Sequence, residues 1–206
     1  MLVPVAPIAP RAILPDDPGV ALRLASTLLE DGRLMANHHR GLWGYTGSGR
    51  DGLGPLTIQS TGVGATSAGL VLSELLEHGL TIAIRAGTAR GFAPALSAGD
   101  LYAVTHAEAG GARLALDAGL SGRLAAGAAS SGVIHSAGAD DTDGPAGAAA
   151  IDLETAQLAR IAARSDLRFA SVLVISATPE QALDHEALAD AVHGAGVLAA
   201  EALTNA

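Results

Sequence analysis

Residues 55–91, PLTIQSTGVGATSAGLVLSELLEHGLTIAIRAGTARG, have the pattern of a strand, a helix and a second strand. Apolar residues recur at helical spacing over residues 65–78, and Gly79 then supplies a residue type that commonly ends helices. The flanking segments 55–61 and 80–86 are short and predict strands. The order strand, helix, strand favours an α/β layer architecture.

The rest of the chain continues this alternation. Further strands are expected at residues 11–14, 43–46, 100–105, 132–136 and 169–176. Further helices are expected at residues 21–29, in the first half of 113–129, at 152–164 and at 179–202, with a break near Gly194 and Gly196. Residues 137–150 are rich in Gly and Ala and predict a mobile loop. No linker separates two cores, so residues 1–206 are predicted to form a single α/β domain.

The composition excludes several classes of function. A formal net charge of −9 argues against nucleic-acid binding, and the absence of lysine rules out a Schiff base or a P-loop lysine. There is no cysteine, so disulfides and thiolate metal sites are absent. The first ten residues lack a basic segment and are interrupted by proline, and no apolar stretch has the length of a membrane span. A cytoplasmic protein without a membrane or nucleic-acid partner is expected.

Arg85 is the first candidate for a functional residue. It lies near the end of an apolar strand and is followed two residues later by glycine. Ligands of α/β sheets collect at the carboxyl ends of strands, and a guanidinium offers forked donors to a phosphate or a carboxylate. A structural ion pair with a carboxylate on a helix is the alternative interpretation.

Two further features also point to the ends of strands. Gly62-Val63-Gly64 joins a strand to a helix, where free backbone N–H groups and the helix dipole favour an anion, although many ordinary turns carry glycines too. Glu154 precedes Leu158 by four residues, so it shares the apolar face of its helix. An inward carboxylate needs hydrogen-bond donors, and sugar hydroxyls would supply them. The alternative is a glutamate that only favours the helix dipole.

The histidines and the common catalytic motifs give no further functional prediction. His38 and His39 are adjacent, but no further ligands follow at metal-binding spacing, so no metal site is predicted. His135 stands alone on a short strand, where a structural role is the more common one. The chain has no Gly-x-Ser-x-Gly elbow, no Walker loop and no dinucleotide fingerprint, which removes support for serine hydrolase and NAD chemistry.

Five short motifs, in this order and spacing, resemble those of the nucleoside phosphorylase family, which includes uridine phosphorylase, hexameric purine nucleoside phosphorylases and methylthioadenosine nucleosidases. They are Leu14-Pro15-Asp16-Asp17-Pro18, Arg40-Gly41-Leu42-Trp43-Gly44-Tyr45-Thr46-Gly47, Ser60-Thr61-Gly62-Val63-Gly64, Ile84-Arg85-Ala86-Gly87-Thr88 and Asp152-Leu153-Glu154-Thr155-Ala156. The resemblance implies a three-layer α/β fold with a central mixed, twisted and partly barrel-like sheet flanked by helices.

The resemblance also implies roles for individual residues. The catalytic residues would be Arg85 and Glu154. Phosphate would be bound at Asp16, Arg40, Arg85 and Thr88, with Arg40 reaching a neighbouring subunit of a homodimer or hexamer. The ribose would contact Val63, Leu153 and Glu154, and the base side would lie at Thr88, Gly91 and His135. No cofactor is implied beyond inorganic phosphate as co-substrate.

The chain departs from the family pattern at several of these places. Asp16 stands where the family usually has a phosphate-binding glycine, and Val20 stands where it usually has an arginine. Ala177 replaces the acid that purine enzymes carry after the late strand. The Gln and Arg with which uridine enzymes hold the base are absent from the shortened segment 137–150, and the N-terminal His of many members is missing.

Three functions remain open at this point. The first is a nucleoside phosphorylase, a pentosyltransferase of the uridine type rather than the purine type, because Thr88 matches the uridine enzymes. The second is a nucleosidase that uses water, with Asp16 or Asp17 as general base. The third is a catalytically weakened nucleoside-binding or scaffold protein.

Overall fold

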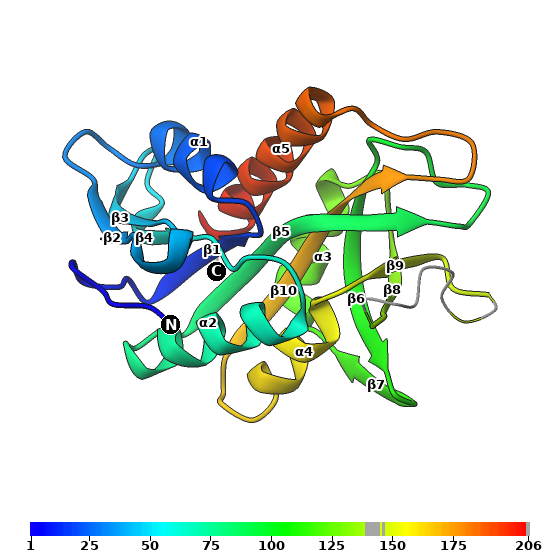
Figure 1. Cartoon of the computed structure of the whole chain (residues 1–206), viewed down its shortest axis with the longest axis horizontal. Coiled ribbons are helices and arrows are strands. Elements are labelled where there is room, and N and C mark those ends of the chain that lie inside the picture. The colour runs from blue at the N-terminus through cyan, green and yellow to red at the C-terminus, as the bar shows by residue number, and fades with distance from the viewer. Residues whose placement is uncertain (139–144, 146, 205–206) are drawn as a thin grey trace.

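The computed structural model describes residues 1–138, 145 and 147–204, and its centre is a ten-stranded mixed sheet (Figure 1). The strand order is β10-β6-β8-β9-β5-β1-β4-β3-β2, and β7 adds to β6. The strands are β1 (Arg11–Pro15), β2 (Leu34–Asn37), β3 (Gly44–Gly49), β4 (Gly54–Gln59), β5 (Ile82–Gly91), β6 (Leu101–Ala109), β7 (Ala112–Ala115), β8 (Ser130–Ser136), β9 (Ala150–Asp152) and β10 (Arg168–Ala177).

Five of these strands close into a barrel-like ring. The path β10-β6-β8-β9-β5 returns to its start because β10 also pairs with β5, in parallel along most of its length. The ring leaves β5 with neighbours on both sides: β1 and β10 flank its first half, and β9 pairs with Arg90 and Gly91 at its end. The long strand β5 therefore belongs both to the ring and to the open part of the sheet.

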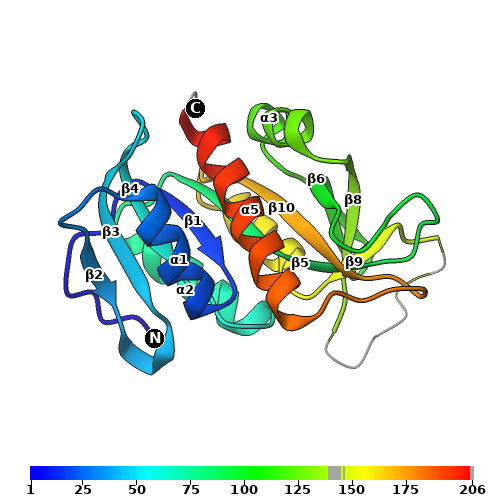
Figure 2. The same cartoon turned by 90° about the horizontal axis from the view of Figure 1, so that it is seen from above.

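Helices cover both faces of the sheet. On one face lie α2 (Ala65–Glu77) and α4 (Thr155–Ala162), and on the other lie α1 (Pro18–Leu28), α3 (Ala118–Gly127) and α5 (His185–Thr204), as Figures 1 and 2 show. Alternate residues of each strand serve the two faces: Ala83 packs in the core under α2 and α4, whereas Ile84 packs in the core under α1 and α5. This alternation follows from the period of two of an extended chain.

The fold agrees with the sequence-based prediction in class and layers and differs in several elements. The helix predicted in the first half of 113–129 begins later than expected: β7 forms a hairpin with β6, and α3 begins at Ala118. The expected helix at 152–164 begins only at Thr155, because 150–152 is a strand. Strand β2 was not anticipated. Residues 139–144 and 146 of the loop predicted at 137–150 lie outside the described residues.

The predicted break in the last helix is also wrong. Helix α5 runs without interruption through Gly194 and Gly196, and a side chain at Gly196 would collide with Leu24 of α1. Glycine is used here for the close approach of two helices, which outweighs its low helix propensity. Within the described part of the chain, none of the helices combines the length and apolar character that crossing a membrane requires.

Candidate functional site

Asp16 follows the carboxyl end of β1 and meets Arg85, which lies in the first half of the neighbouring parallel strand β5. The predicted end of this strand at Ala86 is wrong, because β5 continues to Gly91. Leu14 of β1 lies opposite Arg85 of β5, so the chain leaves β1 and places Asp16 beside the Arg85 side chain. The guanidinium of Arg85 lies against Gly87, where any Cβ would collide with it. The lack of a side chain at Gly87 therefore leaves room for the Arg85 guanidinium.

Two more carboxylates come from the segment between β9 and α4. Asp152 is the last residue of β9, and Glu154 immediately precedes α4. Asp152 is fixed by neighbours, because its Oδ2 accepts a hydrogen bond from the Thr155 N–H at 2.9 Å and its Oδ1 accepts one from the Ser136 hydroxyl. Asp152 thus binds the N–H of the first residue of α4, but the N-cap position predicted for it is held by Glu154, because the helix starts later.

The three carboxylates converge on the single guanidinium of Arg85. The Arg85 Nη2 donates to Glu154 Oε2 at 2.5 Å and to both Asp16 carboxylate oxygens at 3.2 Å, and Nη1 lies 3.4 Å from Asp152 Oδ2. The Arg85 and Asp152 side chains are fully buried, and those of Glu154 and Asp16 are 4% and 16% exposed. We call these four residues the Arg85 cluster. The ion pair that the sequence left open as an alternative for Arg85 is present, in threefold form.

The excess of carboxylates affects the ionisation of the cluster. Burial raises the pKa of Asp16, and the charges of Glu154 and Asp152 raise it further, which together outweigh Arg85 and bring it to about 7. Burial lowers the pKa of Arg85, but its three carboxylate neighbours raise it to a net value above the ordinary one, so the guanidinium stays charged. Asp16 is therefore able to exchange a proton near neutral pH.

The glycine turn before α2 is also occupied by a carboxylate. Gly64 has a φ of 95° and lies at the N-terminus of α2, and its N–H donates to Glu154 Oε1 at 2.6 Å. The left-handed φ explains why glycine is needed at this position. Glu154 therefore uses one oxygen on the helix N-terminus and the other on Arg85.

A cavity of about 280 Å³ opens beside the Arg85 cluster. Five predicted site residues come together in its wall: Asp16, Val63, Thr88, Leu153 and Glu154. Arg85 lies behind this wall, because it has no exposed surface. The remaining lining residues are Ala89, Arg90, Ile151, Asp152 and Ser176.

A second cavity of about 360 Å³ lies between α1 and α5. Asp16 and Thr88 line both cavities and so stand between them. Val20, at the position where the family usually has an arginine, lines this second cavity. Arg23 also lines it, but its guanidinium makes an ion pair with Asp190 at 2.7 Å.

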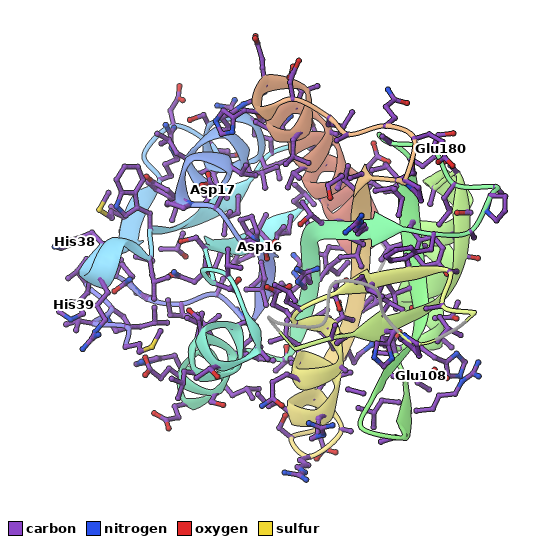
Figure 3. The ribbon with its side chains drawn as sticks, turned by 45° about the vertical axis from the view of Figure 1, so that its right-hand side comes forward. Asp16, Asp17, His38, His39, Glu108 and Glu180 are labelled. Carbon is purple, nitrogen blue, oxygen red and sulfur yellow. The ribbon has the colours of Figure 1, made fainter. Side chains whose placement is uncertain are left out.

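Three predicted site residues lie apart from the first cavity. Arg40 is exposed in the 3-10 helix η1 (His39–Gly41), which Figure 3 locates through the neighbouring labelled His38 and His39 at the outer edge, away from Asp16. His135 of β8 lines another cavity together with Glu108. Gly91 pairs with Ala150 inside the sheet. No group of three or more His, Asp or Glu side chains is placed to hold a metal ion in the part of the chain that the structure describes.

Asp152 is the cluster member that sequence reasoning assigned only to helix capping. In an extended segment, residues i and i+2 point to the same side, so Asp152 and Glu154 both face Arg85 once residues 150–152 form a strand. The prediction of a helix from residue 152 hid this relation. The alternation Ile-Asp-Leu-Glu at residues 151–154 was the available signal.

Known proteins share part of this sequence and nearly all of this fold. No protein-family model matches the chain. A DeoD-type purine nucleoside phosphorylase from Exiguobacterium sibiricum is 36% identical over 95 residues, which is 46% of this chain and 39% of the relative. The corresponding protein of Geobacillus kaustophilus is 35% identical over 95 residues, with the same two shares. A uridine phosphorylase structure from Vibrio fischeri superposes with a TM-score of 0.82, covering 97% of this chain and 93% of that one. The chain is thus similar to nucleoside phosphorylases in sequence over part of its length and in fold over nearly all of it.

The two kinds of comparison carry different information. The structural match has 21% sequence identity, so it shows the shared fold alone, and it confirms the predicted central sheet with its barrel-like part. The sequence matches span about two-fifths of the length of the curated relatives. The comparisons thus show the fold of nucleoside phosphorylases and a partial sequence similarity to them, and the reaction of this chain is the subject of a proposal.

Proposed function

We propose that the first cavity binds a nucleoside and that the chain cleaves its N-glycosidic bond. The observation that carries this proposal is the position of Glu154, whose carboxylate is buried, points into the core of the molecule and still lines the cavity. Each carboxylate oxygen can accept more than one hydrogen bond. The oxygens that Gly64 and Arg85 already engage therefore retain capacity for the hydroxyls of a ribose.

The other lining residues suit a nucleoside. Val63 and Leu153 offer apolar surface on either side of Glu154 in the chain, and Thr88 offers a hydroxyl at the end of the cavity that it shares with Asp16. Ligand cavities of this kind combine apolar walls with a few fixed polar groups. Leu153 and Glu154 come from one segment and Val63 from another, so the ribose would be held between β9–α4 and the turn before α2.

The charge of the cluster matches the chemistry of glycosidic cleavage. Three carboxylates around one guanidinium leave an excess of negative charge beside the cavity. The sugar becomes positively charged as the glycosidic bond breaks, and fixed negative groups stabilise that charge in a site with little water. The protein would thus contribute orientation and electrostatic stabilisation.

Two features of the reaction have to be assigned separately: the base that is released and the molecule that accepts the sugar. Both sets of relatives are phosphorylases by name, which favours phosphate as acceptor. Thr88 and Ala177 favour a uridine-type nucleoside, whereas the relatives with detectable sequence identity are purine enzymes. We assign the acceptor below from the residues around Arg85, and leave the base to a panel of purine and pyrimidine nucleosides.

Substitution Glu154→Gln tests the proposed function. The amide keeps the size of the side chain but loses the charge, so we expect base release to fall at least tenfold, equivalent to about 1.4 kcal/mol, with an unchanged circular dichroism spectrum. Free base is measured by chromatography for each nucleoside, with and without phosphate. The matched control is Glu180→Gln, an exposed glutamate far from Asp16 in Figure 3, which should leave the rate unchanged.

Two results would contradict this proposal. If the wild-type protein binds a nucleoside by calorimetry but releases no base, the chain is a binding protein, the third function considered from the sequence. If Glu154→Gln and Glu180→Gln have equal rates, Glu154 has no part in the site.

A further inference from the structure

We propose that the carboxylate of Asp16 occupies the place of an acceptor anion on Arg85, so that the chain transfers the ribosyl group to water and not to phosphate. This inference rests on the proposed function, since it names the second substrate of the same cavity. Its basis is the geometry of the Arg85 cluster.

Both features that would attract an anion are occupied by side chains of the chain itself. The Arg85 Nη2 faces Asp16 and Glu154, and the Gly64 N–H at the N-terminus of α2 faces Glu154. A phosphate would have to displace the Asp16 carboxylate to reach the guanidinium, because Arg85 has no exposed surface. The displaced carboxylate would then remain close to the phosphate as a like charge.

The charge balance also opposes a bound phosphate. With Asp16 ionised, the cluster carries one positive and three negative groups, and a phosphate would add to the negative side in a buried setting, where such repulsion is weakly screened. Two other arginines line the cavities, and each has its own contact. Arg23 pairs with Asp190, and Arg90 lies 5.4 Å from the centre of the Phe92 ring at the exposed side of the first cavity.

Asp16 has the properties of a general base for water. It is the most exposed carboxylate of the cluster and lines both cavities, so water reaches it. Its raised pKa of about 7 leaves it partly ionised at neutral pH and able to take a proton there. The hydrogen bonds from Arg85 hold the Asp16 carboxylate in place at the cavity wall.

The reaction that follows is a balanced hydrolysis. A water molecule forms a bond from its oxygen to the anomeric carbon and gives a proton to the Asp16 carboxylate. The bond from the anomeric carbon to the base nitrogen breaks, and its electron pair stays on that nitrogen, which takes up a proton from solvent. The products are the free base and ribose. Asp16 then returns its proton to solvent.

The experiment combines product analysis with a direct measurement of phosphate binding. For wild type, we expect base release in phosphate-free buffer, ribose as the sugar product when phosphate is added, and no phosphate binding by calorimetry. Asp16→Asn should lower the rate by about two orders of magnitude, the scale of a lost general base. Asp16→Gly introduces the glycine that the family usually has at this position and removes the carboxylate from Arg85. This variant should bind inorganic phosphate at least roughly tenfold more tightly than wild type.

The control is Asp17→Asn. Asp17 is adjacent in sequence, lines the second cavity and caps α1 by accepting the Val20 N–H, a role that asparagine also fills. This variant should keep the wild-type rate and the wild-type lack of phosphate binding. Loss of activity in Asp17→Asn together with retention in Asp16→Asn would contradict the proposal and identify Asp17 as the general base.

The outcomes separate this inference from the proposed function. Ribose 1-phosphate as product, or a strict need for phosphate, overturns the inference and leaves nucleoside cleavage intact. If no nucleoside is cleaved, the proposed function fails, and the phosphate titrations still decide whether Asp16 fills the anion place. Equal phosphate affinity of wild type and Asp16→Gly would show that it does not.

Discussion

Two arginines on neighbouring parallel strands have very different ion-pair surroundings. Arg168 is the first residue of β10, and Arg85 of β5 lies opposite Ser171 of β10. Arg168 is 40% exposed and pairs with one carboxylate, Asp117, at 3.0 Å, whereas buried Arg85 holds three. Arg168 thus forms a balanced ion pair, whereas Arg85 is surrounded by an excess of carboxylates.

The ionisation of the acids shows the same contrast. A hydrogen bond from Arg168 lowers the pKa of Asp117, helped by the backbone amides that it caps, so this carboxylate is stabilised in its charged form. Burial and two like charges raise the pKa of Asp16. Perturbed groups of the second kind gather at functional sites, because a structural pair has no use for an excess of one charge. Such an excess lies here beside the carboxyl ends of β1 and β9, and α/β proteins bind ligands at strand ends of this kind.

The largest effect is expected from removing Arg85. Arg85→Met leaves three carboxylates without their cation, and breaking a buried ion pair in this way costs about 3–5 kcal/mol. We therefore expect the free energy of unfolding, measured by urea denaturation at neutral pH, to fall by that amount. Part of the loss should be recovered in acid, since protonation neutralises the carboxylates. A variant as stable as wild type at neutral pH would mean that the cluster is not buried as described.

A smaller effect is expected from pH, with opposite signs for the two acids. Asp16 binds more protons in the folded state than in the unfolded state between its ordinary pKa of 3.8 and about 7, so its contribution makes the free energy of unfolding fall as pH rises through this window. Asp117 has a lowered pKa, so its stabilisation is present above its ordinary pKa and is lost as pH falls.

Urea denaturation across pH separates these two contributions. Asp16→Asn should remove the decline of stability between mildly acidic and neutral pH, while Asp117→Asn should reduce the loss in acid. The groups that face Asp16 are Arg85 of β5 and the carboxylates Asp152 and Glu154 of the β9–α4 segment, and Asp17, Arg23 and His185 share its second cavity. An unchanged decline in Asp16→Asn would assign it to another of these groups.

The smallest effect is expected from Arg168→Met. The Arg168 side chain is substantially exposed, and ion pairs of this kind contribute at most about 1 kcal/mol. Asp117 keeps its capping bond to the Leu120 N–H in this variant, so α3 should retain its start. A loss of stability as large as that of Arg85→Met would remove the distinction between the Arg168 ion pair and the Arg85 cluster.

The sequence predicted the parts of the site that depend on local pattern. Arg85 on an apolar strand and Glu154 on an inward face were both visible, because each follows from a short repeat of apolar residues. The end of that strand was predicted too early, since β5 continues to Gly91. The α/β class followed from the alternation of strands and helices. The family motifs then supplied the barrel-like part of the sheet, which rests on pairing between distant strands such as β5 and β9.

The parts that were missed depend on contacts between distant segments. That Asp16 and Asp152 both reach Arg85 depends on the parallel register of β1 with β5 and on a strand at residues 150–152, neither of which has a strong local signal. The continuity of α5 through Gly196 depends on its packing against Leu24 of α1. Propensity alone favours a break there, and tertiary packing overrides it.

The central claim concerns what lies on the guanidinium of Arg85. A crystal structure of the protein grown in phosphate tests it most directly. The account predicts the Asp16 carboxylate beside Arg85 Nη2, as in the 3.2 Å contact described above, with no phosphate between them. A phosphate bound to Arg85, with the Asp16 side chain turned away, would contradict it.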